Sequence, residues 1–387
     1  MRNTWLIFFL AIISFLSGTD EYIVTGILDK IAETNGVSIA SAGQLFTVFS
    51  ISFGLLTPIV IVLTRKMDRK NLLMIALLIF SLSNFIVATF EGFVVIFIAR
   101  IASGVSAGLI EVTLLTIATT IAEPEKRGSA IATIITGFSA ALIVGVPMGR
   151  FLASVMDWRF IFVALSVLGT LFLILIYKLI PGMQGEEEKP LKEQLKILKN
   201  KKIAYILIVT FFWMFSYSIV LSYISPYLLQ VVKVSSNTVS IALLIYGLSS
   251  LVGSKLGGFS TDKYGAIKTI FLGMSINAFG LISFSFVGES SLIFLIPLII
   301  WGIAAWSSGP ALQFRLIYLA PSVAGIILSL YTSISQIGMA FGAGIGGLIV
   351  NFGSLDLLNW VGASSVILII FSLLIVNQKQ KVESQNK

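Results

Sequence analysis

Long apolar stretches follow one another along almost the whole chain, and short polar segments separate them. A helix needs about 20 mostly apolar residues to cross the hydrocarbon core of a membrane. On that basis the pattern predicts twelve spanning helices, at 4–28, 40–63, 71–90, 93–121, 128–152, 158–180, 203–230, 237–258, 267–287, 291–318, 322–350 and 356–376. The predicted fold class is therefore an all-α membrane protein with twelve transmembrane helices.

One polar segment, 181–202, is longer than the others and divides the predicted helices six and six. It is densely charged and contains an amphipathic stretch. We therefore predict an N-terminal six-helix bundle (1–180), a cytoplasmic amphipathic linker (181–202), a C-terminal six-helix bundle (203–376) and a cytoplasmic tail (377–387). The first apolar run has no small-residue cleavage site, so we expect it to be retained as a helix and not removed as a signal peptide.

A constant shift of 197 positions relates the two halves of the sequence. It superimposes Val37-Ser38 on Val234-Ser235, Thr64 on Thr261, Gly145 on Gly342 and Gly149 on Gly346. A single offset that links three separated regions indicates a duplicated six-helix unit, and hence two pseudo-symmetric bundles. Parallel repeats about an axis along the membrane normal are a plan of transporters, which hold their cargo between the halves near the midplane.

Composition narrows the possible chemistry. Hydrophobic residues make up 57% and charged residues 11% of the 387 positions, unlike the mixture of a soluble domain. The chain has no cysteine and no histidine, which excludes disulfides, thiolate metal sites and the usual near-neutral proton carrier. Proton chemistry must therefore fall to carboxylates, and we expect neither a metal nor a cofactor.

The basic residues are distributed unevenly between the two sides of the predicted bundle. If the N-terminus is cytoplasmic, 20 of the 26 Lys and Arg residues fall in cytoplasmic segments, and only Lys30, Arg159 and Lys233 fall in outside segments. Basic residues collect on the cytoplasmic side of membrane proteins. The chain is therefore predicted to be a multi-pass protein of the cell membrane with both termini in the cytoplasm. The net charge of +8 then reflects this distribution and not a nucleic-acid partner.

A loop after the eighth predicted helix carries the first recognisable motif. Its residues Gly258, Asp262, Lys263 and Gly265 form a pattern that resembles the GxxxDxxGxxx loop of the major facilitator superfamily. An acid at a helix end beside bases can latch neighbouring helices through charge-assisted bonds and the helix dipole. The alternative is an ordinary basic loop with a turn glycine.

The first-half copy of this loop departs from the pattern. Arg65 stands where the acid is expected, Asp68 stands where the second glycine is expected, and Arg69 follows. The first-half latch is therefore in doubt, although these residues remain candidates for gating.

Two further helices resemble the same superfamily. The fourth carries Arg100, Gly104 and Gly108 in an RxxxGxxxG pattern, whose buried arginine the resemblance ties to proton coupling. The fifth carries Gly145-Val-Pro147-Met-Gly149, which is similar to the GxPxG motif of exporters. The proline weakens the backbone ladder and the glycines allow close approach, so we expect this helix to bend against its partner in the other half. The alternative is a simple kinked packing helix.

The first helix narrows the resemblance to one branch. The segment Gly18-Thr-Asp20-Glu21-Tyr22, together with Gly26, Val37-Ser38 and Gln44, resembles the pattern of bacterial sugar and drug exporters. The stretch from Trp301-Gly302 to Ala320-Pro321 is similar to the same branch. The resemblance covers nearly the whole chain and implies a twelve-span drug:proton antiporter, with bacterial sugar efflux transporters as the nearest members.

Three acids, Asp20, Glu21 and Glu111, lie inside predicted spans and are candidates for proton coupling together with Arg100. At 1.5 Å per residue, Asp20 and Arg100 lie roughly 12 Å and 10 Å from the outer ends of their helices, and thus at similar depth. Glu111 lies roughly 16 Å farther along and cannot pair with Arg100. Adjacent residues on a helix point about 100° apart. Of Asp20 and Glu21, we therefore expect one to face the central cavity and the other to face the packed interior. The resemblance favours Glu21 as the shared acid.

These acids suggest a coupling hypothesis. A proton taken up by Glu21 or Asp20 from outside weakens its tie to Arg100, and cargo entering from inside promotes loss of that proton. The alternative is a permanent Asp20–Arg100 pair that only orients helices. Glu111 is a second proton site, an acid that recognises a cation, or a side chain that reaches toward the cytoplasmic interface.

Polar and aromatic residues at mid-depth are the candidate cargo contacts: Tyr22, Gln44, Asn84, Trp213, Tyr217, Tyr223, Tyr246, Gln313 and Gln336. Such groups stack on rings and bond hydroxyls, but in membrane proteins they also serve packing and interfacial belts. The predicted function is proton-coupled export of a small organic compound, a sugar or a drug, by a chain that acts as a monomer among membrane lipids. A symporter or facilitator of the same fold is the alternative, and an intramembrane enzyme or receptor is a distant one.

Overall fold

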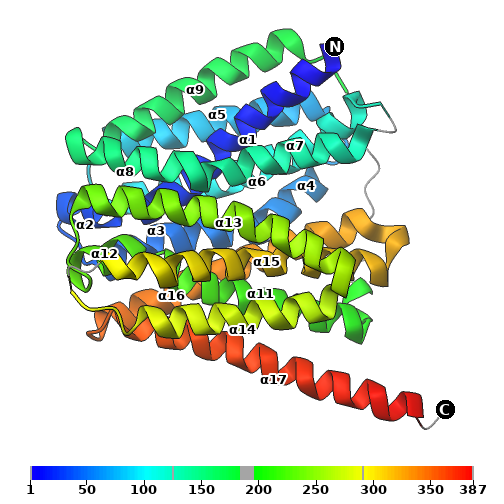
Figure 1. Cartoon of the computed structure of the whole chain (residues 1–387). Coiled ribbons are helices and arrows are strands. Elements are labelled where there is room, and N and C mark those ends of the chain that lie inside the picture. Colours follow the sequence, from blue (N-terminus) through cyan, green and yellow to red (C-terminus); the bar gives the residue numbers. More distant parts are fainter. Residues whose placement is uncertain (1, 124–125, 184–195, 290–291, 386–387) are drawn as a thin grey trace.

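The chain folds into a bundle of long helices in a computed structural model that describes residues 2–123, 126–183, 196–289 and 292–385 (Figure 1). Within these ranges twelve helical segments are long and apolar enough to cross a membrane. They are Thr4–Gly26, Ile39–Leu63, Arg69–Thr89, Phe93–Ile121, Arg127–Val155, Arg159–Leu179, Lys201–Leu221, Ser236–Tyr264, Ala266–Phe284, Leu292–Leu319, Gly325–Asn351 and Leu357–Ile375. The predicted number, order and type of elements are therefore confirmed.

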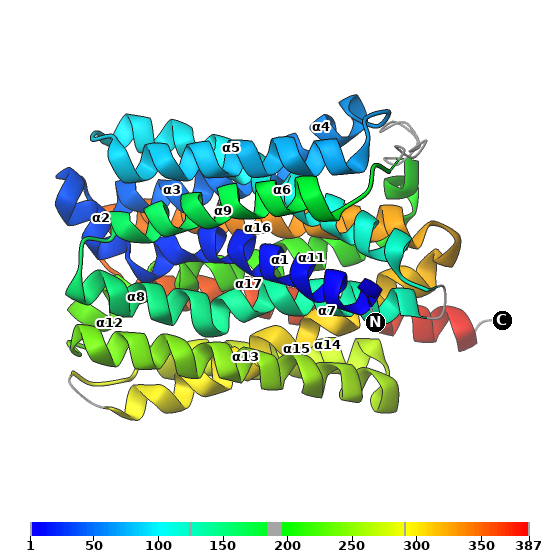
Figure 2. The ribbon, with the colours of Figure 1, turned by 90° about the horizontal axis from the view of Figure 1, so that it is seen from above.

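The first six spans pack mainly on one another, and so do the last six. The first set contains α1 (Arg2–Gly26), α3 (Ile39–Ile51), α4 (Thr57–Leu63), α5 (Arg69–Thr89), α6 (Phe93–Ile121), α7 (Arg127–Ala140), α8 (Val146–Val155) and α9 (Arg159–Leu179). The second contains α11 (Lys201–Leu221), α13 (Ser236–Tyr264), α14 (Ala266–Phe284), α15 (Leu295–Leu319), α16 (Ala324–Asn351) and α17 (Leu357–Gln385). Figure 2 shows α5 and α13 on opposite flanks, with both chain ends at one end of the bundle. We call that end the terminal side.

The duplication predicted from the shift of 197 positions is visible in local geometry. Ser38 and Ser235 are the N-caps of α3 and α13, with φ/ψ of −68°/155° and −70°/157°. Each hydroxyl accepts a backbone N–H three residues later, at 3.1 Å from Ser41 and 3.2 Å from Thr238. The serine hydroxyl satisfies a donor that the helix leaves unpaired. The two bundles therefore begin their second spans in the same way.

Two predicted helices end earlier than expected, on the side opposite the termini. The first stops at Gly26, and a short helix α2 (Leu28–Asn35) follows. The predicted helix 203–230 is divided into α11 and α12 (Ile224–Gln230). Pro226 has no N–H to continue the helical ladder, which favours a break four residues earlier. The predicted range was too long because the apolar pattern continues through this break.

Other predicted boundaries differ at the chain's polar segments. The helix α17 continues to Gln385, through most of the predicted tail at 377–387. Much of the predicted linker, 184–195, lies outside the described residues; its end includes a short 3₁₀ turn, Lys196–Lys199. Shorter 3₁₀ turns precede α15 and α16, at Leu292–Phe294 and Pro321–Val323.

The second and fifth spans each contain one π-helical turn. These turns are η1 (Ser52–Leu56) between α3 and α4, and η3 (Ala141–Gly145) between α7 and α8. In both spans a proline follows as the second residue after the turn, Pro58 in one and Pro147 in the other. Proline has no backbone N–H to donate, and its ring crowds the preceding turn. The wider π turn relieves this crowding, so both helices are locally irregular. The sequence predicted this irregularity at Pro147 only.

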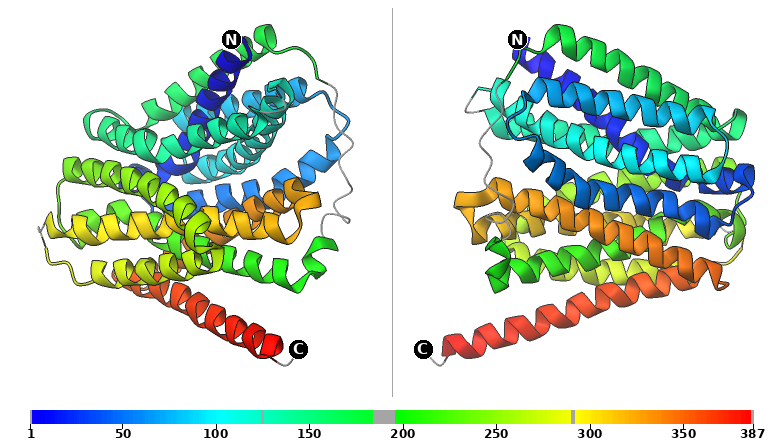
Figure 3. Two further views of the ribbon diagram at one scale, coloured as in Figure 1. Left: turned by 45° about the vertical axis from the view of Figure 1, so that its right-hand side comes forward. Right: turned by 180° about the vertical axis from the view of Figure 1, so that it is seen from behind.

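The two halves meet along these same irregular helices. The pair α3 and η1 packs on α16, η3 and α8 pack on α13, and α1 contacts α12. Toward the terminal side the outermost helices α9 and α17 diverge, as the ribbon shows from several directions (Figures 1 and 3). Within the halves, α1 packs on α6 and α11 packs on α16.

Candidate functional site

A buried ion pair joins the first and fourth spans. Arg100 Nη1 on α6 donates to Asp20 Oδ1 on α1 at 2.8 Å, and both side chains are 0% exposed. The Arg100 guanidinium also lies 4.3 Å from the centre of the Phe49 ring on α3. A buried charge is expensive to desolvate unless it is paired. The acid and the base predicted at the same depth therefore neutralise each other inside the first half.

The neighbouring acid faces the other half of the molecule. Gln336 Nε2 on α16 donates to Glu21 Oε1 at 3.0 Å, and both residues are buried. Glu21 follows Asp20 directly and thus points about 100° away around the helix. Glu21 Oε2 and Gln336 Oε1 have no hydrogen-bond partner among the described residues. One helical turn therefore carries an acid held within its own half and an acid bonded across the interface.

The third membrane acid lies closer to the terminal side. The Ser14 hydroxyl on α1 is 2.9 Å and 3.0 Å from the two carboxylate oxygens of Glu111 on α6. The same hydroxyl is 3.1 Å from the carbonyl oxygen of Ile134 on α7. Glu111 thus joins α1, α6 and α7 and has no part in the Asp20–Arg100 pair.

An aromatic group in the second half adjoins Glu21. It consists of Tyr217 on α11, Tyr246 on α13, and Trp301 and Trp306 on α15. The ring centroids of Tyr246 and Trp301 are 4.7 Å apart, and those of Tyr217 and Trp306 are 5.6 Å apart. The hydroxyls and indole N–H groups of all four residues are buried. The Tyr246 hydroxyl lies near the Tyr217 hydroxyl and the Trp306 indole, but none of the four groups makes a hydrogen bond of good geometry with a described residue. Buried polar atoms normally have hydrogen-bond partners, so four unsatisfied polar atoms in one aromatic group require an explanation.

The structure brings some predicted cargo contacts together and separates others. Tyr22 lies beside Glu21 and close to Tyr217 and Tyr246. Its ring packs edge-on against Phe138, with centroids 6.0 Å apart. With Gln336, these tyrosines place four of the nine predicted residues around Glu21.

The remaining predicted cargo contacts are bonded elsewhere. Trp213 Nε1 donates to the Ala305 carbonyl at 2.8 Å, and the Tyr223 hydroxyl donates to the Ala343 carbonyl at 2.9 Å. Asn84 Nδ2 donates to the Phe80 carbonyl at 2.9 Å, next to Asp20. The side chain of Gln44 packs where α3 meets α16, and Gln313 lies near Tyr331.

Sequence reasoning missed Trp301 and Trp306 as site residues. Trp301 belongs to the Trp301-Gly302 pair that supported the family resemblance, and Gly302 lets α15 approach Tyr246 closely. Trp306 stands five residues later and had no comparable signal. Helical spacing alone could have placed Trp306 near Trp301, but not beside Tyr217 of another helix.

Hydrogen bonds and an ion pair close the interface between the two halves on the side opposite the termini. Arg150 at the end of the fifth span is 1% exposed; it donates to the Gly26 carbonyl at 3.1 Å and pairs with Asp29. Its Nη2 reaches across the interface to Ser236 Oγ at 3.0 Å. From the second half, Ser225 Oγ donates to the carbonyls of Thr25 and Gly26 at 3.0 Å and 3.1 Å. Helix-end carbonyls lack intrahelical donors, and here Arg150 and Ser225 supply them.

The glycines of the fifth span do not face the other half, contrary to the sequence-based expectation. A Cβ at Gly137, Gly145 or Gly149 would collide with Ala11, Thr19 or Ile23, all on α1. The glycine face of the fifth span therefore packs against the first span of its own half.

Close approach to the other half depends instead on a glycine of α13. A Cβ at Gly247 would lie 2.6 Å from the Ile143 Cα and 2.8 Å from the Leu142 carbonyl oxygen. The π turn that contains Leu142 and Ile143 thus packs directly against α13.

The gating residues predicted in a loop after 258 lie instead in the last turns of α13, which continues to Tyr264, and only Gly265 lies outside that helix. Asp262 is exposed and makes no hydrogen bond or ion pair with described residues, and Lys263 Nζ lies 5.2 Å from the Tyr264 ring centre. Gly265 has a φ of +87° at the start of α14, which favours glycine, whereas a Cβ at Gly258 would meet nothing within 4 Å.

The first-half copy of the loop has a structural role. Asp68 is the N-cap of α5 and accepts the N–H groups of Lys70 and Asn71 at 2.8 Å and 3.2 Å. Arg69 is buried, and its backbone N–H donates to the Met183 carbonyl at 3.0 Å. Arg65, the residue in the position of the acid, is half-buried.

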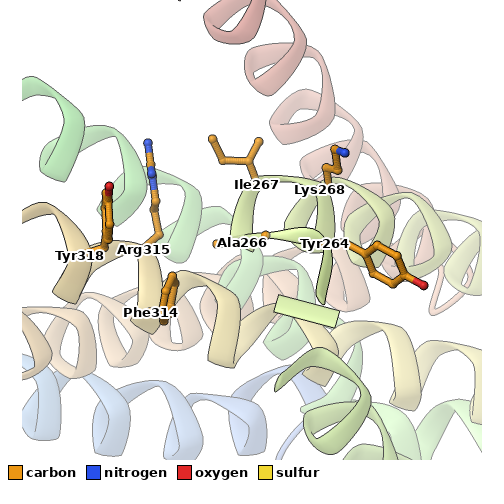
Figure 4. A pocket seen from close by; sticks show the side chains of 8 residues that line it. Tyr264, Ala266, Ile267, Lys268, Phe314, Arg315 and Tyr318 are labelled. Atoms are coloured by element: carbon orange, nitrogen blue, oxygen red, sulfur yellow. The ribbon is translucent and has the colours of Figure 1, made fainter. Parts of the chain in front are cut away.

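A hollow of about 410 Å³ lies on the terminal side beside the second-half loop. Figure 4 shows Arg315 and Tyr318 of α15 on one side of it and Lys268 of α14 on the other. None of the membrane acids lines this hollow. In the part of the chain that the structure describes, no group of three or more acidic residues is arranged to hold a metal ion.

Twelve spans in two related halves, with polar groups gathered between them, define a secondary transporter. The family model described as Major Facilitator Superfamily matches residues 10–343, and the chain belongs to that family. The chain is therefore a membrane-embedded transporter of a small molecule and not an enzyme.

Curated relatives extend over nearly the whole chain. The "Uncharacterized MFS-type transporter YbcL" of Bacillus subtilis is 46% identical over 98% of this chain and 98% of its own length. A "Probable sugar efflux transporter" of Helicobacter pylori is 25% identical over 97% and 96%. Among solved structures, a D-xylose-proton symporter has a TM-score of 0.78 at 17% identity and covers 96% of each chain. The structural likeness supports the fold, and the sequence relatives support the resemblance to sugar efflux proteins.

Proposed function

We propose that this chain is a proton-coupled exporter that moves a small organic compound, a sugar or a drug, out of the cell by alternating access. The observation that carries the proposal is the Glu21–Gln336 hydrogen bond, because it joins a buried acid of one half to the other half at 3.0 Å. A group that binds a proton and also bridges the moving halves can link protonation to conformation.

The physical basis of this link is the strength of the bridging bond. An ionised carboxylate accepts a stronger hydrogen bond than a neutral acid does. When Glu21 is ionised, Gln336 therefore holds the halves together more firmly than when Glu21 is protonated. When the halves separate at this point, the carboxylate loses its donor in a buried setting, and proton uptake becomes favourable.

Asp20 and Arg100 supply the fixed electrostatic setting for Glu21. Their pair lies one residue away along α1 and is completely buried. We assign Arg100 the role of stabilising the negative charge on either helix 1 acid, so that the proton is shared between a paired acid and a bridging acid. Cargo that enters next to Glu21 competes for the same polar groups.

The aromatic group is the proposed wall of the cargo site. Tyr217, Tyr246, Trp301 and Trp306 offer ring faces for stacking and four polar atoms without protein partners. A cargo with hydroxyl or carbonyl acceptors would satisfy those donors. Tyr22 and Gln336 belong to the same site, and Gln44, Asn84, Trp213, Tyr223 and Gln313 contribute to its surroundings.

Gating is assigned to the elements that must change between states. The bonds of Arg150 and Ser225 close the side opposite the termini, while Pro147, Gly145 and Gly149 let the fifth span move on α1. The exposed Asp262, with Lys263, Gly258 and Gly265, forms a latch of the opposite state, and Arg65, Asp68 and Arg69 form its first-half counterpart.

Direction and orientation rest on three observations. Relatives named sugar efflux transporters match nearly the whole chain, and the Gly145-Val-Pro147-Met-Gly149 element resembles that of exporters. The excess of Lys and Arg on the terminal side favours cytoplasmic termini in the bacterial cell membrane. Because one chain contains both halves, we propose that the monomer is the transport unit.

The test uses the purified full chain in liposomes with an imposed proton gradient. Radiolabelled lactose, chloramphenicol and tetraphenylphosphonium serve as probes of the sugar, neutral drug and cation classes. We expect gradient-driven movement of at least one probe opposite to the proton flux, and its loss in Glu21→Gln. The control is Glu289→Gln, an exposed acid that pairs with Lys233 on the molecular surface.

Two outcomes would contradict this proposal. Proton and probe moving in the same direction would establish a symporter, which is the alternative for this fold. Full pH-dependent counterflow in both Glu21→Gln and Asp20→Asn would remove the first helix from the coupling mechanism.

A further inference from the structure

The hydrogen-bond geometry at Glu111 depends on where one proton lies. Ser14 Oγ is within 3.1 Å of three oxygen atoms: both carboxylate oxygens of Glu111 and the Ile134 carbonyl oxygen. A serine hydroxyl carries a single hydrogen and can also accept hydrogen bonds. If Glu111 is ionised, all three neighbours are acceptors and Ser14 can serve only one of them well.

A protonated Glu111 resolves this conflict. Its O–H donates to Ser14 Oγ, and the Ser14 hydroxyl then donates to the Ile134 carbonyl. Two of the three contacts then become ordinary hydrogen bonds, and no charge remains. Ser14 is completely buried, whereas Glu111 is half-buried.

The charges around Glu111 favour the same protonation state. In the part of the chain that the structure describes, its carboxylate is bonded to Ser14 alone, whereas Asp20 has Arg100 as a counter-charge. Glu21 and Tyr22 on α1 are the titratable groups that act on it electrostatically.

The elements packed against α6 provide no counter-charge at this depth. The segments α3, η1 and α4 contain no charged residue. The bases of α5 and α7 stand at their terminal-side ends, at Arg69, Lys70 and Arg127. An ionised acid at membrane depth without such a partner is costly.

We propose that Glu111 is a second proton-binding site, which holds its proton in this conformation through the Ser14–Ile134 hydrogen-bond chain. The site lies about 9 Å from Asp20 toward the terminal side, because Ser14 precedes Asp20 by six residues on α1. It extends the proposed proton coupling, but its occupancy can be measured without any transport.

The site also acts on the bridging acid. Two negative charges in a shared low-dielectric region oppose each other, so a proton on Glu111 makes ionisation of Glu21 easier. Glu111 thus stays neutral while Glu21 exchanges its proton in this state. Proton release from Glu111 is expected only after the Ser14 contact is broken.

Infrared difference spectroscopy of the purified full chain, titrated with pH, tests this assignment directly. A protonated carboxyl group has its own C=O stretching band, which is sensitive to hydrogen bonding. We expect Glu111→Gln to lose the band of one protonated carboxyl per chain. Ser14→Ala should keep that band and shift it to higher frequency, because the acid loses its hydrogen-bond acceptor.

Controls separate this proposal from the proposed transport function. Glu21→Gln should retain the Glu111 band, whether or not the variant still transports. Because glutamine has the size and neutrality of protonated glutamate, Glu111→Gln should fold normally; Glu111→Asp, with a side chain too short to keep the contact, should shift the band if glutamine proves unstable. An unchanged carboxyl spectrum in both Glu111 variants would overturn the proposal. So would binding of tetraphenylphosphonium that Glu111→Gln abolishes without loss of a band, since Glu111 would then be an ionised cation site.

Discussion

At the scale of single residues, the Asp20–Arg100 pair joins α1 to α6 through two buried charges. Both groups are fully buried, and Arg100 also packs on the Phe49 ring. Removing one partner of a buried pair leaves an uncompensated charge, which costs about 3–5 kcal/mol. We expect Arg100→Gln to lower the free energy of unfolding in detergent by that amount, as measured by thermal or denaturant unfolding.

The double variant Asp20→Asn with Arg100→Gln separates structure from coupling. It removes both charges, so most of the lost stability should return. Proton-driven transport should not return, because the charge next to Glu21 remains absent. A double variant that transports normally would reduce the pair to a structural tie between α1 and α6.

Two tryptophans provide a matched comparison of structural and functional roles. Trp213 donates its indole N–H to the Ala305 carbonyl at 2.8 Å, whereas the Trp306 indole N–H has no partner among the described residues. Both changes to phenylalanine remove similar volume, but only Trp213→Phe removes a buried side-chain hydrogen bond. We expect Trp213→Phe to destabilise the chain by about 1–2 kcal/mol more than Trp306→Phe.

Binding of the transported probe should show the opposite order. Trp306→Phe is expected to weaken binding, as followed by tryptophan-fluorescence quenching, and Trp213→Phe to leave it unchanged. Equal loss of stability in the two variants would mean that Trp306 has a protein partner in solution.

The sequence could place some of these residues but not their partners. Depth along two predicted helices was enough to bring Asp20 and Arg100 to one level. The partner of Glu21 lies 315 positions away in the sequence, and nothing local to Gln336 indicates it. Partners across the interface depend on how the two halves are rotated against each other, which hydropathy does not specify.

At the scale of elements, α1 and the fifth span pack through a face of small residues. A Cβ at Gly137 would collide with the Ala11 carbonyl oxygen, which belongs to the rigid backbone of α1. A Cβ at Gly258 on α13 would meet nothing within 4 Å. Close backbone approach of this kind is the common use of small residues between membrane helices.

These two glycines give opposite expectations for one substitution. Gly137→Ala must displace α1 from the fifth span and should lower the unfolding temperature of the detergent-solubilised chain. Gly258→Ala meets no neighbour and removes a helix-weakening glycine, so stability should rise by up to about 1 kcal/mol. Equal effects of the two changes would contradict the packing described between α1 and α7.

The sequence could predict which segments are helices, because hydropathy decides this. It could not predict where those helices end or break. Each of the twelve spans is long enough for its apolar length alone to indicate a helix. The break before Pro226 and the π turn before Pro58 are different, because they lie inside continuous apolar sequence. Proline signals local irregularity, but tertiary packing determines whether the helix kinks, widens or stops.

At the scale of the whole molecule, closure of the side opposite the termini rests on a small polar network. Arg150 connects the end of α1 to Ser236 of the other half. Leu243 on α13 is 3% exposed behind this network, near Gly26. The native chain has no cysteine, so a single Leu243→Cys reports on opening without further changes.

We expect Arg150→Gln to increase the labelling rate of Cys at position 243 by about tenfold for each 1.4 kcal/mol by which it favours the open state. The measurement is maleimide labelling of the reconstituted protein over time. Glu33→Cys, at an exposed position on α2, corrects for reagent reactivity. A rate unchanged by Arg150→Gln would show that closure depends on apolar packing, such as that of Gly247, and not on Arg150.

The same cysteine-free background tests how the whole molecule sits in the membrane. Basic residues cluster on the terminal side, and moving that side across the membrane would oppose the preference of Lys and Arg for the cytoplasm. Glu33 on α2 and Tyr264 at the end of α13 are exposed on opposite sides of the bundle. In intact bacterial cells a membrane-impermeant maleimide should therefore label Glu33→Cys at once and Tyr264→Cys only after the membrane is permeabilised. The reverse pattern would invert the proposed topology, and the side closed by Arg150 would then face the cytoplasm.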